Sequence, residues 1–256
     1  MRIIRVEHGG TSYYGILEDG LVFRLHQQPG HMEPIPLSEA KVLPLATPSK
    51  VVCVGLNYKA HAEELGYPLP NMPSFFLKPP SSIIGNGEPI ILPSGMGRIE
   101  HEAELAMVVG KVCRNLTPEE AEESLFGFTC ANDVTAREVQ KVDPLIGHCK
   151  SYDTFCPIGP WIETDLEDIN DLSIRCLVNG EVRQSANTGD MIFRPLDLLC
   201  FLSRVMTLMP GDVILTGTPP GISPILADDV VQVSIEGIGT LSNPVEGPGP
   251  EEKILQ

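Results

Sequence analysis

The sequence predicts a mostly β protein with few helices and not a doubly wound α/β fold. Short apolar or alternating segments recur along the chain and are separated by turn residues. The 256 residues also include 24 glycines and 24 prolines, which favour turns over long helices. A doubly wound sheet would instead alternate strands with helices of regular length. The length suits one large domain, or a large domain with a small appendage.

Residues 1–48 predict a small N-terminal β domain. Segments 3–6, 13–17 and 21–25 are apolar or alternating, and glycine-containing turns separate them. This pattern is typical of an antiparallel meander. The prolines that follow predict the joint to a second domain at 49–256: Pro34, Pro36, Pro44 and Pro48.

Short helices are predicted at four places in the larger domain. The first runs over residues 57–66, with Asn57 as its cap and Gly66 as its stop. A capping box with proline at the first helical position begins a second at Thr117, and Gly127 would end it. The others are expected from about 132 to 141 and from about 195 to 207. Strands are expected over 51–55, 127–131, 172–178, 213–216 and 230–235.

The segment 99–110 sets acidic residues into an otherwise apolar strand. Alternate residues of a strand share a face, so Glu100, Glu102 and Glu104 would point one way and the apolar residues the other. Carboxylates on one face repel one another unless a cation lies between them, and a hard divalent cation takes oxygen ligands. The alternative for an isolated Glu-x-Glu is a solvated acidic edge strand.

Asp133 supplies the second half of the argument for a metal site. It follows a predicted strand at 127–131, and a strand end is a rigid place from which to project a ligand. Two glutamates and an aspartate from neighbouring strands, completed by water, form an all-oxygen site for Mg²⁺ or Mn²⁺. The alternative role for Asp133 is a helix N-cap. Arg137 and Gln140 would lie on the same helical face and reach a bound ligand, or form a solvated polar stripe.

His61 and Glu64 lie three residues apart in the helix predicted over 57–66. This spacing brings both side chains together, so Glu64 could orient His61 as a general base. The alternative is a surface histidine beside an acidic turn.

Two further segments offer groups that could hold an anion. Residues 211–221 predict a strand that leads into a glycine loop, where backbone N–H groups and threonine hydroxyls could hold a carboxylate; an ordinary hairpin turn is the alternative. Lys150 could neutralise a developing enolate, although a lone lysine is more often at the surface.

The composition narrows the classes of partner. A net charge of −16 disfavours binding to nucleic acid or anionic lipid. The seven cysteines form no C-x-x-C pair and lie in apolar or mixed segments, which predicts buried reduced thiols and a cytoplasmic protein. No apolar segment is long enough to predict a membrane span or a signal peptide.

In combination, these motifs resemble the fumarylacetoacetate hydrolase family from about Lys50 to Val245. The resemblance is carried by Gly55-Leu56-Asn57-Tyr58-Lys59-Ala60-His61, Phe76-Leu77-Lys78-Pro79-Pro80-Ser81-Ser82, His101-Glu102-Ala103-Glu104-Leu105, Asn132-Asp133-Val134-Thr135-Ala136-Arg137, Lys150-Ser151-Tyr152-Asp153-Thr154-Phe155 and Leu215-Thr216-Gly217-Thr218-Pro219. The order and length of these motifs are specific for the family and much less so for one substrate.

The resemblance implies a catalytic domain with a rolled, partly barrel-like mixed sheet, in a homodimer. It makes Glu102, Glu104 and Asp133 the ligands of Mg²⁺ or Mn²⁺, with Ca²⁺ a further candidate. His61 and Glu64 become the acid/base dyad, carried on a mobile lid. The resemblance also implies that four further residues hold the substrate or an ordered water near the metal: Arg137, Gln140, Lys150 and Thr218. Lys150 is counted among the catalytic groups as well.

One departure from the family concerns the substrate. The animal enzymes that cleave fumarylacetoacetate carry a tyrosine where this chain has Pro144, and the segment before Lys150 is shorter here. Both differences argue against that substrate. They indicate similarity to the smaller bacterial members that act in the catabolism of aromatic compounds.

A 2-oxo acid can chelate a metal through its carboxylate and keto oxygens, and its enolate is then stabilised. Proton transfer alone gives an isomerase, and isomerisation of 2-hydroxyhepta-2,4-diene-1,7-dioate is the first expectation. Hydrolysis of an acylpyruvate or decarboxylation of oxaloacetate is the alternative, because the same dyad suits each outcome. The contrasting class is a non-catalytic protein that binds a metal and a small dicarboxylic acid.

Overall fold

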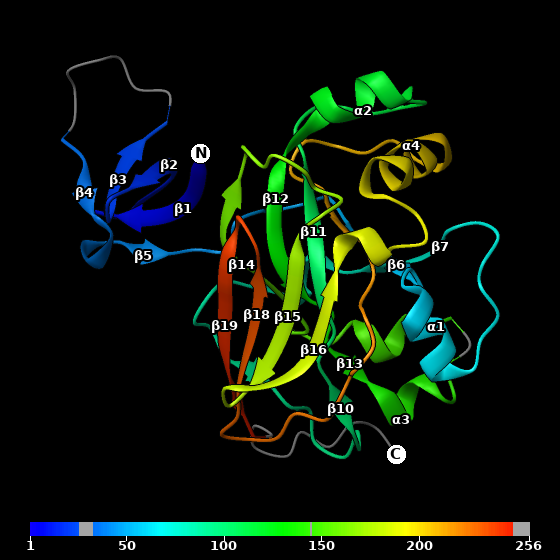
Figure 1. Ribbon diagram of the computed structural model, residues 1–256. Helices are drawn as coiled ribbons and strands as arrows, with labels where there is room; N and C mark the ends of the chain where they lie inside the picture. The colour runs from blue at the N-terminus through cyan, green and yellow to red at the C-terminus, as the bar shows by residue number, and fades with distance from the viewer. Residues whose placement is uncertain (26–32, 144, 248–256) are drawn as a thin grey trace.

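The computed structural model describes residues 1–25, 33–143 and 145–247 (Figure 1). Within them the protein is mostly β, with short helices, as the sequence predicts. The α-helices are α1 (Lys59–Leu65), α2 (Pro118–Ser124), α3 (Arg137–Gln140) and α4 (Pro195–Val205). Single 3-10 turns occur at Leu37–Glu39, Pro80–Ser82, His148–Lys150 and Thr188–Asp190.

The larger of two main sheets has the strand order β4-β3-β2-β1-β14-β12-β11-β17-β6-β7 among the described residues, with β5 paired to β1 and β8 to β14. Its members are β1 (Arg2–His8), β2 (Thr11–Glu18), β3 (Leu21–Arg24), β4 (Ile35–Pro36), β5 (Lys41–Val42), β6 (Val51–Gly55), β7 (Ser74–Lys78), β8 (Ile83–Ile84), β11 (Ala103–Val109), β12 (Leu125–Asn132), β14 (Cys156–Glu163) and β17 (Val213–Leu215). Strand β11 lies between β12 and β17 and pairs antiparallel with both. The acidic strand is therefore central in the sheet and not an edge strand.

A second sheet packs against the first, with the order β16-β15-β18-β19-β9 (Figure 1). It consists of β9 (Ile90–Ile91), β15 (Ser173–Val178), β16 (Glu181–Asn187), β18 (Val230–Ile235) and β19 (Gly239–Glu246), and a separate small pair joins β10 (Ile99–Glu100) to β13 (Thr135–Ala136). The apolar core between the sheets contains Leu105, Met107 and Val109 on one face of β11. Ala106 and Val108, on the opposite face, belong to a second core with residues of β1 and β6. Both faces of β11 are therefore buried.

The N-terminal meander forms as predicted and continues the larger sheet. Strand β1 pairs with β14, where Ile3 lies opposite Ile162, and the amino group of Met1 binds the Glu163 carboxylate. Because β1 also contributes to the second core, no break in packing marks residue 48. The proposed division of the chain at this residue stays a prediction.

Three of the predicted helix boundaries are wrong. Helix α2 has the predicted capping box but ends at Ser124, and Gly127 lies inside β12, where a Cβ would come within 2.5 Å of the Glu163 carbonyl oxygen. The N-cap of α1 is Tyr58 and not Asn57, although Gly66 does end that helix in the left-handed conformation. Residues Thr135–Ala136 form β13, which pairs with β10, so the helix predicted from about 132 begins only at Arg137, as α3.

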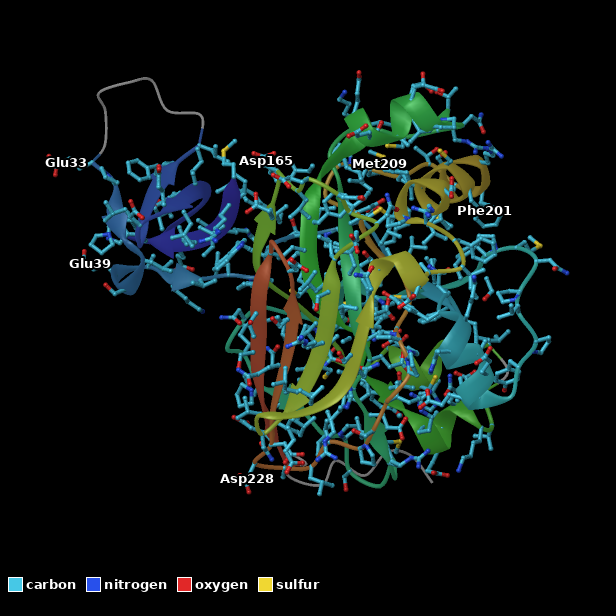
Figure 2. The ribbon with its side chains drawn as sticks, in the orientation of Figure 1. Glu33, Glu39, Asp165, Phe201, Met209 and Asp228 are labelled. Carbon is cyan, nitrogen blue, oxygen red and sulfur yellow. The ribbon has the colours of Figure 1, made fainter. Side chains whose placement is uncertain are left out.

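Acidic side chains such as Glu33, Glu39 and Asp228 are exposed and project outward (Figure 2). All seven cysteines are buried and unbridged. Among the described residues, no helix has both the length and the apolar character needed to cross a membrane.

Candidate metal and acid/base site

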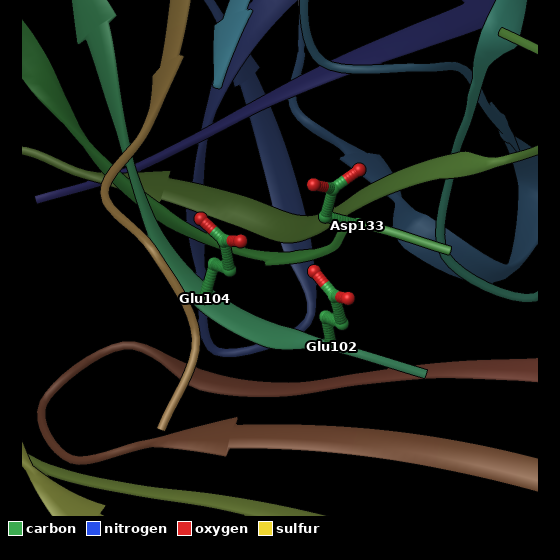
Figure 3. A group of neighbouring side chains, drawn as sticks. All are labelled: Glu102, Glu104 and Asp133. Carbon is green, nitrogen blue, oxygen red and sulfur yellow. The ribbon is translucent and has the colours of Figure 1, made fainter. Parts of the chain in front are cut away.

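Three buried carboxylates meet where β11 begins and β12 ends. Ala103 of β11 lies opposite Asn132 of β12, so Glu102 and Glu104, on either side of Ala103, lie close to Asp133, which follows β12. The Asp133 N–H donates to the Glu102 carbonyl at 2.8 Å, which fixes this register. One carboxylate oxygen from each of Glu102, Glu104 and Asp133 lies within 4.8 Å of the other two (Figure 3). The predicted ligand set is thus brought together in space.

Three cationic side chains surround two of these carboxylates. Lys150 Nζ lies 2.7 Å from Glu102 Oε2 and 2.6 Å from Asp133 Oδ2. Arg137 Nη2 contacts Glu102 Oε1 at 2.6 Å, and Lys78 Nζ contacts Asp133 Oδ1 at 2.5 Å. Burial alone would raise the pKa of Glu102, but Lys150 and Arg137 hold it far below its usual range. Glu102 is therefore ionised.

Glu104 is the exception, and it shows that the site suits a cation. Among the described residues, no lysine or arginine lies within ion-pair distance of its carboxylate, which accepts only the Gly217 N–H, at 2.5 Å. The pKa of Glu104 is raised well above its usual range by burial and then by the negative charges of Asp133 and Glu102. A divalent cation bound by the three carboxylates would relieve this repulsion, and an all-oxygen donor set is the one that Mg²⁺ and Mn²⁺ prefer. The residues present therefore fit such an ion.

His61 and Glu64 form a hydrogen-bonded pair on α1, as their spacing predicts. His61 Nδ1 lies 2.8 Å from Glu64 Oε2, and the histidine is buried. A second oxygen of Glu64 accepts the Gly221 N–H at 3.0 Å. Because an ionised carboxylate only accepts hydrogen bonds, Nδ1 carries the proton, and in the neutral ring Nε2 carries the lone pair. The side chain is thus set up as a base.

Arg137 and Gln140 lie at the two ends of the short helix α3. Arg137 Nη1 donates to Gln140 Oε1 at 2.6 Å, and its Nε donates to Glu100 Oε2 at 2.7 Å. Glu100, the first acid of the 99–110 segment, therefore pairs with Arg137 and with Arg98 and is not in the carboxylate cluster. Residues 101–102 interrupt the strand between β10 and β11, but Arg137 bridges Glu100 and Glu102, so these two carboxylates still lie on the same side.

The glycine loop at 216–221 does hold carboxylates, but they belong to the protein. Its Gly217 N–H binds Glu104, and its Gly221 N–H binds Glu64. The Thr218 hydroxyl donates to the Ala103 carbonyl at 2.9 Å. In this conformation these three donors are already used, which argues against the expectation that they hold the carboxylate of a substrate.

One cavity of about 360 Å³ unites the predicted groups. It lies between α1 and α3, and its wall includes His61, Glu102, Glu104, Asp133, Arg137, Gln140, Lys150 and Thr218. Glu64 stands behind His61 and orients it. Leu65, Tyr67, Phe76 and Ile146 add an apolar part to the wall. Pro144, on which the argument against fumarylacetoacetate rests, lies outside the described residues.

Sequence reasoning assigned no role to Lys78 or Gln184. Lys78 is fully buried on β7 and also donates to the Phe155 carbonyl at 2.7 Å. On β7 it shares a face with Phe76, but the sequence predicts no strand over 74–78, so this signal is visible only in the structure. Gln184 lies in a polar stretch of β16, and its contacts join segments distant in sequence, so no local pattern identifies it.

Two family descriptions match adjoining parts of the chain. The family described as "Fumarylacetoacetate (FAA) hydrolase C-terminal" matches residues 50–246, and one described as "Rv2993c-like, N-terminal" matches residues 1–44. The human protein named oxaloacetate tautomerase FAHD2A, mitochondrial, is 42% identical over 225 residues, which cover 82% of this chain and 71% of that protein.

Two solved structures share the whole architecture. One, titled 2-hydroxyhepta-2,4-diene-1,7-dioate isomerase, from Mycobacterium marinum, has a TM-score of 0.89 at 39% identity and covers 98% of this chain and 100% of its own. The other, maleylpyruvate hydrolase from Sphingobium sp. SYK-6 in complex with manganese(II) and pyruvate, has a TM-score of 0.82 at 30% identity, with coverages of 97% and 100%. The chain therefore belongs to the fumarylacetoacetate hydrolase family, whose members include isomerases and hydrolases.

Proposed function

We propose that this protein is a divalent-metal-dependent enzyme that moves a proton between carbon and oxygen of a 2-oxo acid. The observation that carries the proposal is the common cavity: a base oriented by a carboxylate and a cluster of three carboxylates line the same 360 Å³ space. A protein that only binds a dicarboxylic acid would have no use for the oriented base.

Glu102, Glu104 and Asp133 would hold the ion, and three carboxylates leave coordination positions for water or substrate. When bound, Mg²⁺ or Mn²⁺ supplies Lewis-acid stabilisation of the negative charge that develops on the substrate oxygen. The maleylpyruvate hydrolase structure, with its manganese and pyruvate, supports both the ion and the 2-oxo acid class.

In the enol-to-keto direction, His61 takes the hydroxyl proton of the enol at Nε2 and delivers it to carbon. In the reverse direction it takes the proton from the carbon next to the keto group and returns it to the oxygen. Glu64 keeps the Nδ1 proton in place and stabilises the imidazolium that forms between the two transfers. Arg137 and Gln140, at the opposite wall, would bind the substrate through the N–H groups that remain after Arg137 has donated to Gln140, Glu100 and Glu102. Lys150 would add positive charge beside the oxygen that becomes negative.

The first substrate we propose is 2-hydroxyhepta-2,4-diene-1,7-dioate, isomerised to its 2-oxo form. The structural similarity to the Mycobacterium marinum isomerase supports this choice. Oxaloacetate, converted between enol and keto forms, is a smaller 2-oxo dicarboxylic acid that undergoes the same proton transfer, and the similarity to oxaloacetate tautomerase FAHD2A supports it. Hydrolysis of an acylpyruvate is the second candidate function, supported by the similarity to maleylpyruvate hydrolase.

The test follows the loss of ultraviolet absorbance of each enol, with purified protein and Mg²⁺, and repeats it with EDTA. Loss faster than the uncatalysed rate, abolished by EDTA and by His61→Ala, is the expected result. Proton NMR of acetopyruvate under the same conditions tests the second candidate. Metal-dependent formation of acetate and pyruvate, without faster ketonisation of either enol, would replace the isomerase with a C–C hydrolase.

A further inference from the structure

The side-chain amide of Gln184 lies between the glycine loop at 216–221 and the start of β11, which with Glu102 is called here the metal-binding strand. It comes from β16, an edge strand of the second sheet, and is completely buried. Its Oε1 accepts hydrogen bonds from the Ala103 N–H and from His101 Nδ1, each at 3.0 Å. Its Nε2 donates to Thr218 Oγ1 at 2.8 Å and to the Pro219 carbonyl at 2.7 Å. All four hydrogen-bonding positions of the amide are thus used.

Two backbone groups fix which end of the amide is which. The Ala103 N–H can only donate and the Pro219 carbonyl can only accept, so the oxygen must face Ala103 and the nitrogen must face Pro219. It follows that Thr218 Oγ1 accepts from Gln184 and that its own proton goes to the Ala103 carbonyl, 2.9 Å away. Both backbone groups of Ala103 are therefore held, one directly by Gln184 and the other through Thr218.

These contacts act at the residues that matter for the ion. Ala103 lies between Glu102 and Glu104. It is the first residue of β11, and the pairing of β11 with β17 begins only at Ala106. On this side of β11, the backbone groups of Ala103 form hydrogen bonds with the side chains of Gln184 and Thr218 instead of with a neighbouring strand. On the loop side, Thr218 and Pro219 lie between Gly217, whose N–H binds Glu104, and Gly221, whose N–H binds Glu64.

The loop also fits closely against the strand that carries Gln184. Gly221 adopts a φ of +97°, and a Cβ there would come within 2.2 Å of the Arg183 carbonyl oxygen, so only glycine allows this approach. Gly217 similarly lies where a Cβ would come within 2.7 Å of Asn57 Cβ, at the base of α1. The loop is held between β16 and the segment that carries His61.

We infer that Gln184 is a positioning residue, which fixes the glycine loop against the metal-binding strand and thereby aligns the carboxylates of Glu102, Glu104 and Glu64. This inference rests on the proposed metal site but not on the proposed reaction. Gln184 is not in the cavity wall, so it acts through Ala103, Thr218 and the two glycine N–H groups.

The test measures Mn²⁺ affinity by electron paramagnetic resonance, without substrate. Gln184→Glu keeps the acceptor side of the amide but, when ionised, cannot donate to the Pro219 carbonyl. We expect the Mn²⁺ dissociation constant to rise about 10- to 100-fold, as for other residues that orient ligands. Gln232→Glu is the matched control, because Gln232 lies on β18 of the same sheet and makes none of these contacts; its Mn²⁺ affinity should be unchanged.

A second pair of variants covers the case in which Gln184→Glu does not fold. Thr218→Val removes the hydroxyl link to Ala103 and should weaken Mn²⁺ binding, whereas Thr218→Ser keeps the link and should retain wild-type Mn²⁺ affinity. Thermal unfolding in EDTA records the stability of each variant. Lower stability with wild-type Mn²⁺ affinity in Gln184→Glu and Thr218→Val would reduce Gln184 to a purely structural role and overturn the inference. Because no turnover is measured, failure of the proposed reaction would leave this result intact.

Discussion

His61 Nδ1 lies 2.8 Å from Glu64 Oε2, and the other oxygen of Glu64 accepts the Gly221 N–H at 3.0 Å. The carboxylate therefore joins the proposed base to the glycine loop. This loop in turn binds Glu104 through Gly217, so one short segment of backbone holds a member of the dyad and a member of the carboxylate cluster.

Removing the base should separate turnover from metal binding. In His61→Ala we expect the catalytic rate to fall about 10²- to 10⁴-fold, the usual contribution of a general acid/base, while Mn²⁺ affinity stays within about twofold of wild type because no carboxylate of the cluster contacts His61. Turnover and Mn²⁺ titration are measured on the same preparation. His8→Ala, on β1 and away from the cavity, is the control and should change neither. A parallel loss of metal affinity in His61→Ala would show that the assigned roles are wrong.

Glu64→Gln tests the tautomer of His61. The Gly221 N–H requires an acceptor, so the glutamine oxygen should face Gly221 and its NH₂ should face His61 Nδ1. The imidazole proton would then move to Nε2, and the base would lose its lone pair toward the cavity. We expect at least a tenfold loss of the catalytic rate with unchanged folding. In a Ser-His-Asp triad, the same carboxylate-to-amide change leaves the histidine in the wrong tautomer and lowers the catalytic rate by much more than tenfold. A crystal structure and ¹⁵N NMR of His61 would check the tautomer, and a variant with wild-type turnover would refute this account.

Metal removal should abolish activity reversibly. We expect EDTA to stop turnover and Mg²⁺ or Mn²⁺ to restore it. Glu104→Gln should weaken Mn²⁺ binding by more than the 10- to 100-fold typical of residues that only orient a ligand. Glu100→Gln is the matched control on the same segment, because Glu100 pairs with arginines and lies outside the cluster. Equal Mn²⁺ affinities in the two variants would contradict the assignment of Glu104.

Lys150 carries a charge in direct competition with a metal ion. Its Nζ lies within 2.7 Å of oxygens from both Glu102 and Asp133. Lys150→Met should therefore bind Mn²⁺ more tightly while turnover falls, because a positive charge is lost both from the cluster and from the cavity wall. Lys141→Met is the control: Lys141 lines the same cavity but pairs with the exposed Glu138. Weaker Mn²⁺ binding in Lys150→Met would mean that the lysine orients the ligands and does not compete with the ion.

Asp212 should make stability depend on acid pH. Burial raises its pKa, but hydrogen bonds from Lys50, the Met209 N–H and Ser49 outweigh burial, so the pKa is lowered in the folded protein. A lowered pKa means that the unfolded chain binds the proton more tightly. The stabilisation is thus present above a pH of about 4 and is lost as the pH falls through the folded value.

Chemical denaturation at a series of pH values measures this effect. Asp212→Asn should be less stable than wild type at neutral pH and should lose less free energy of unfolding on acidification. Asp165→Asn, at an exposed aspartate, should keep the wild-type slope (Figure 2). An Asp212→Asn curve parallel to that of wild type would contradict the prediction.

The parts of the fold that sequence could predict depend on local signals. The Thr117 capping box, the N-terminal meander and the apolar strands at 51–55 and 230–235 are local patterns, and all four form. The helix expected from 132 fails because Thr135 pairs with Glu100, a long-range contact that overrides local propensity. Gly127 fails as a helix stop for the same kind of reason, since its role is a close approach of two distant strands.

The site divides in the same way. His61 and Glu64 are found by helical spacing, and Glu102, Glu104 and Asp133 by their positions on strands, because those spacings translate directly into proximity. Lys78, Gln184 and the N–H donors of the glycine loop act across 34 or more residues of sequence. The spacing of a single chain carries no information about such contacts, so only the folded structure reveals them.

The most direct test of the central claim compares the Mg²⁺-loaded protein with the Mg²⁺-loaded His61→Ala variant. The rate measured is that of ketonisation of 2-hydroxyhepta-2,4-diene-1,7-dioate or of the enol of oxaloacetate. The account predicts that the wild-type protein accelerates at least one of these conversions and that the variant, with its metal affinity intact, is at least 100-fold slower. Equal rates in the two proteins, or no acceleration of either enol, would contradict it.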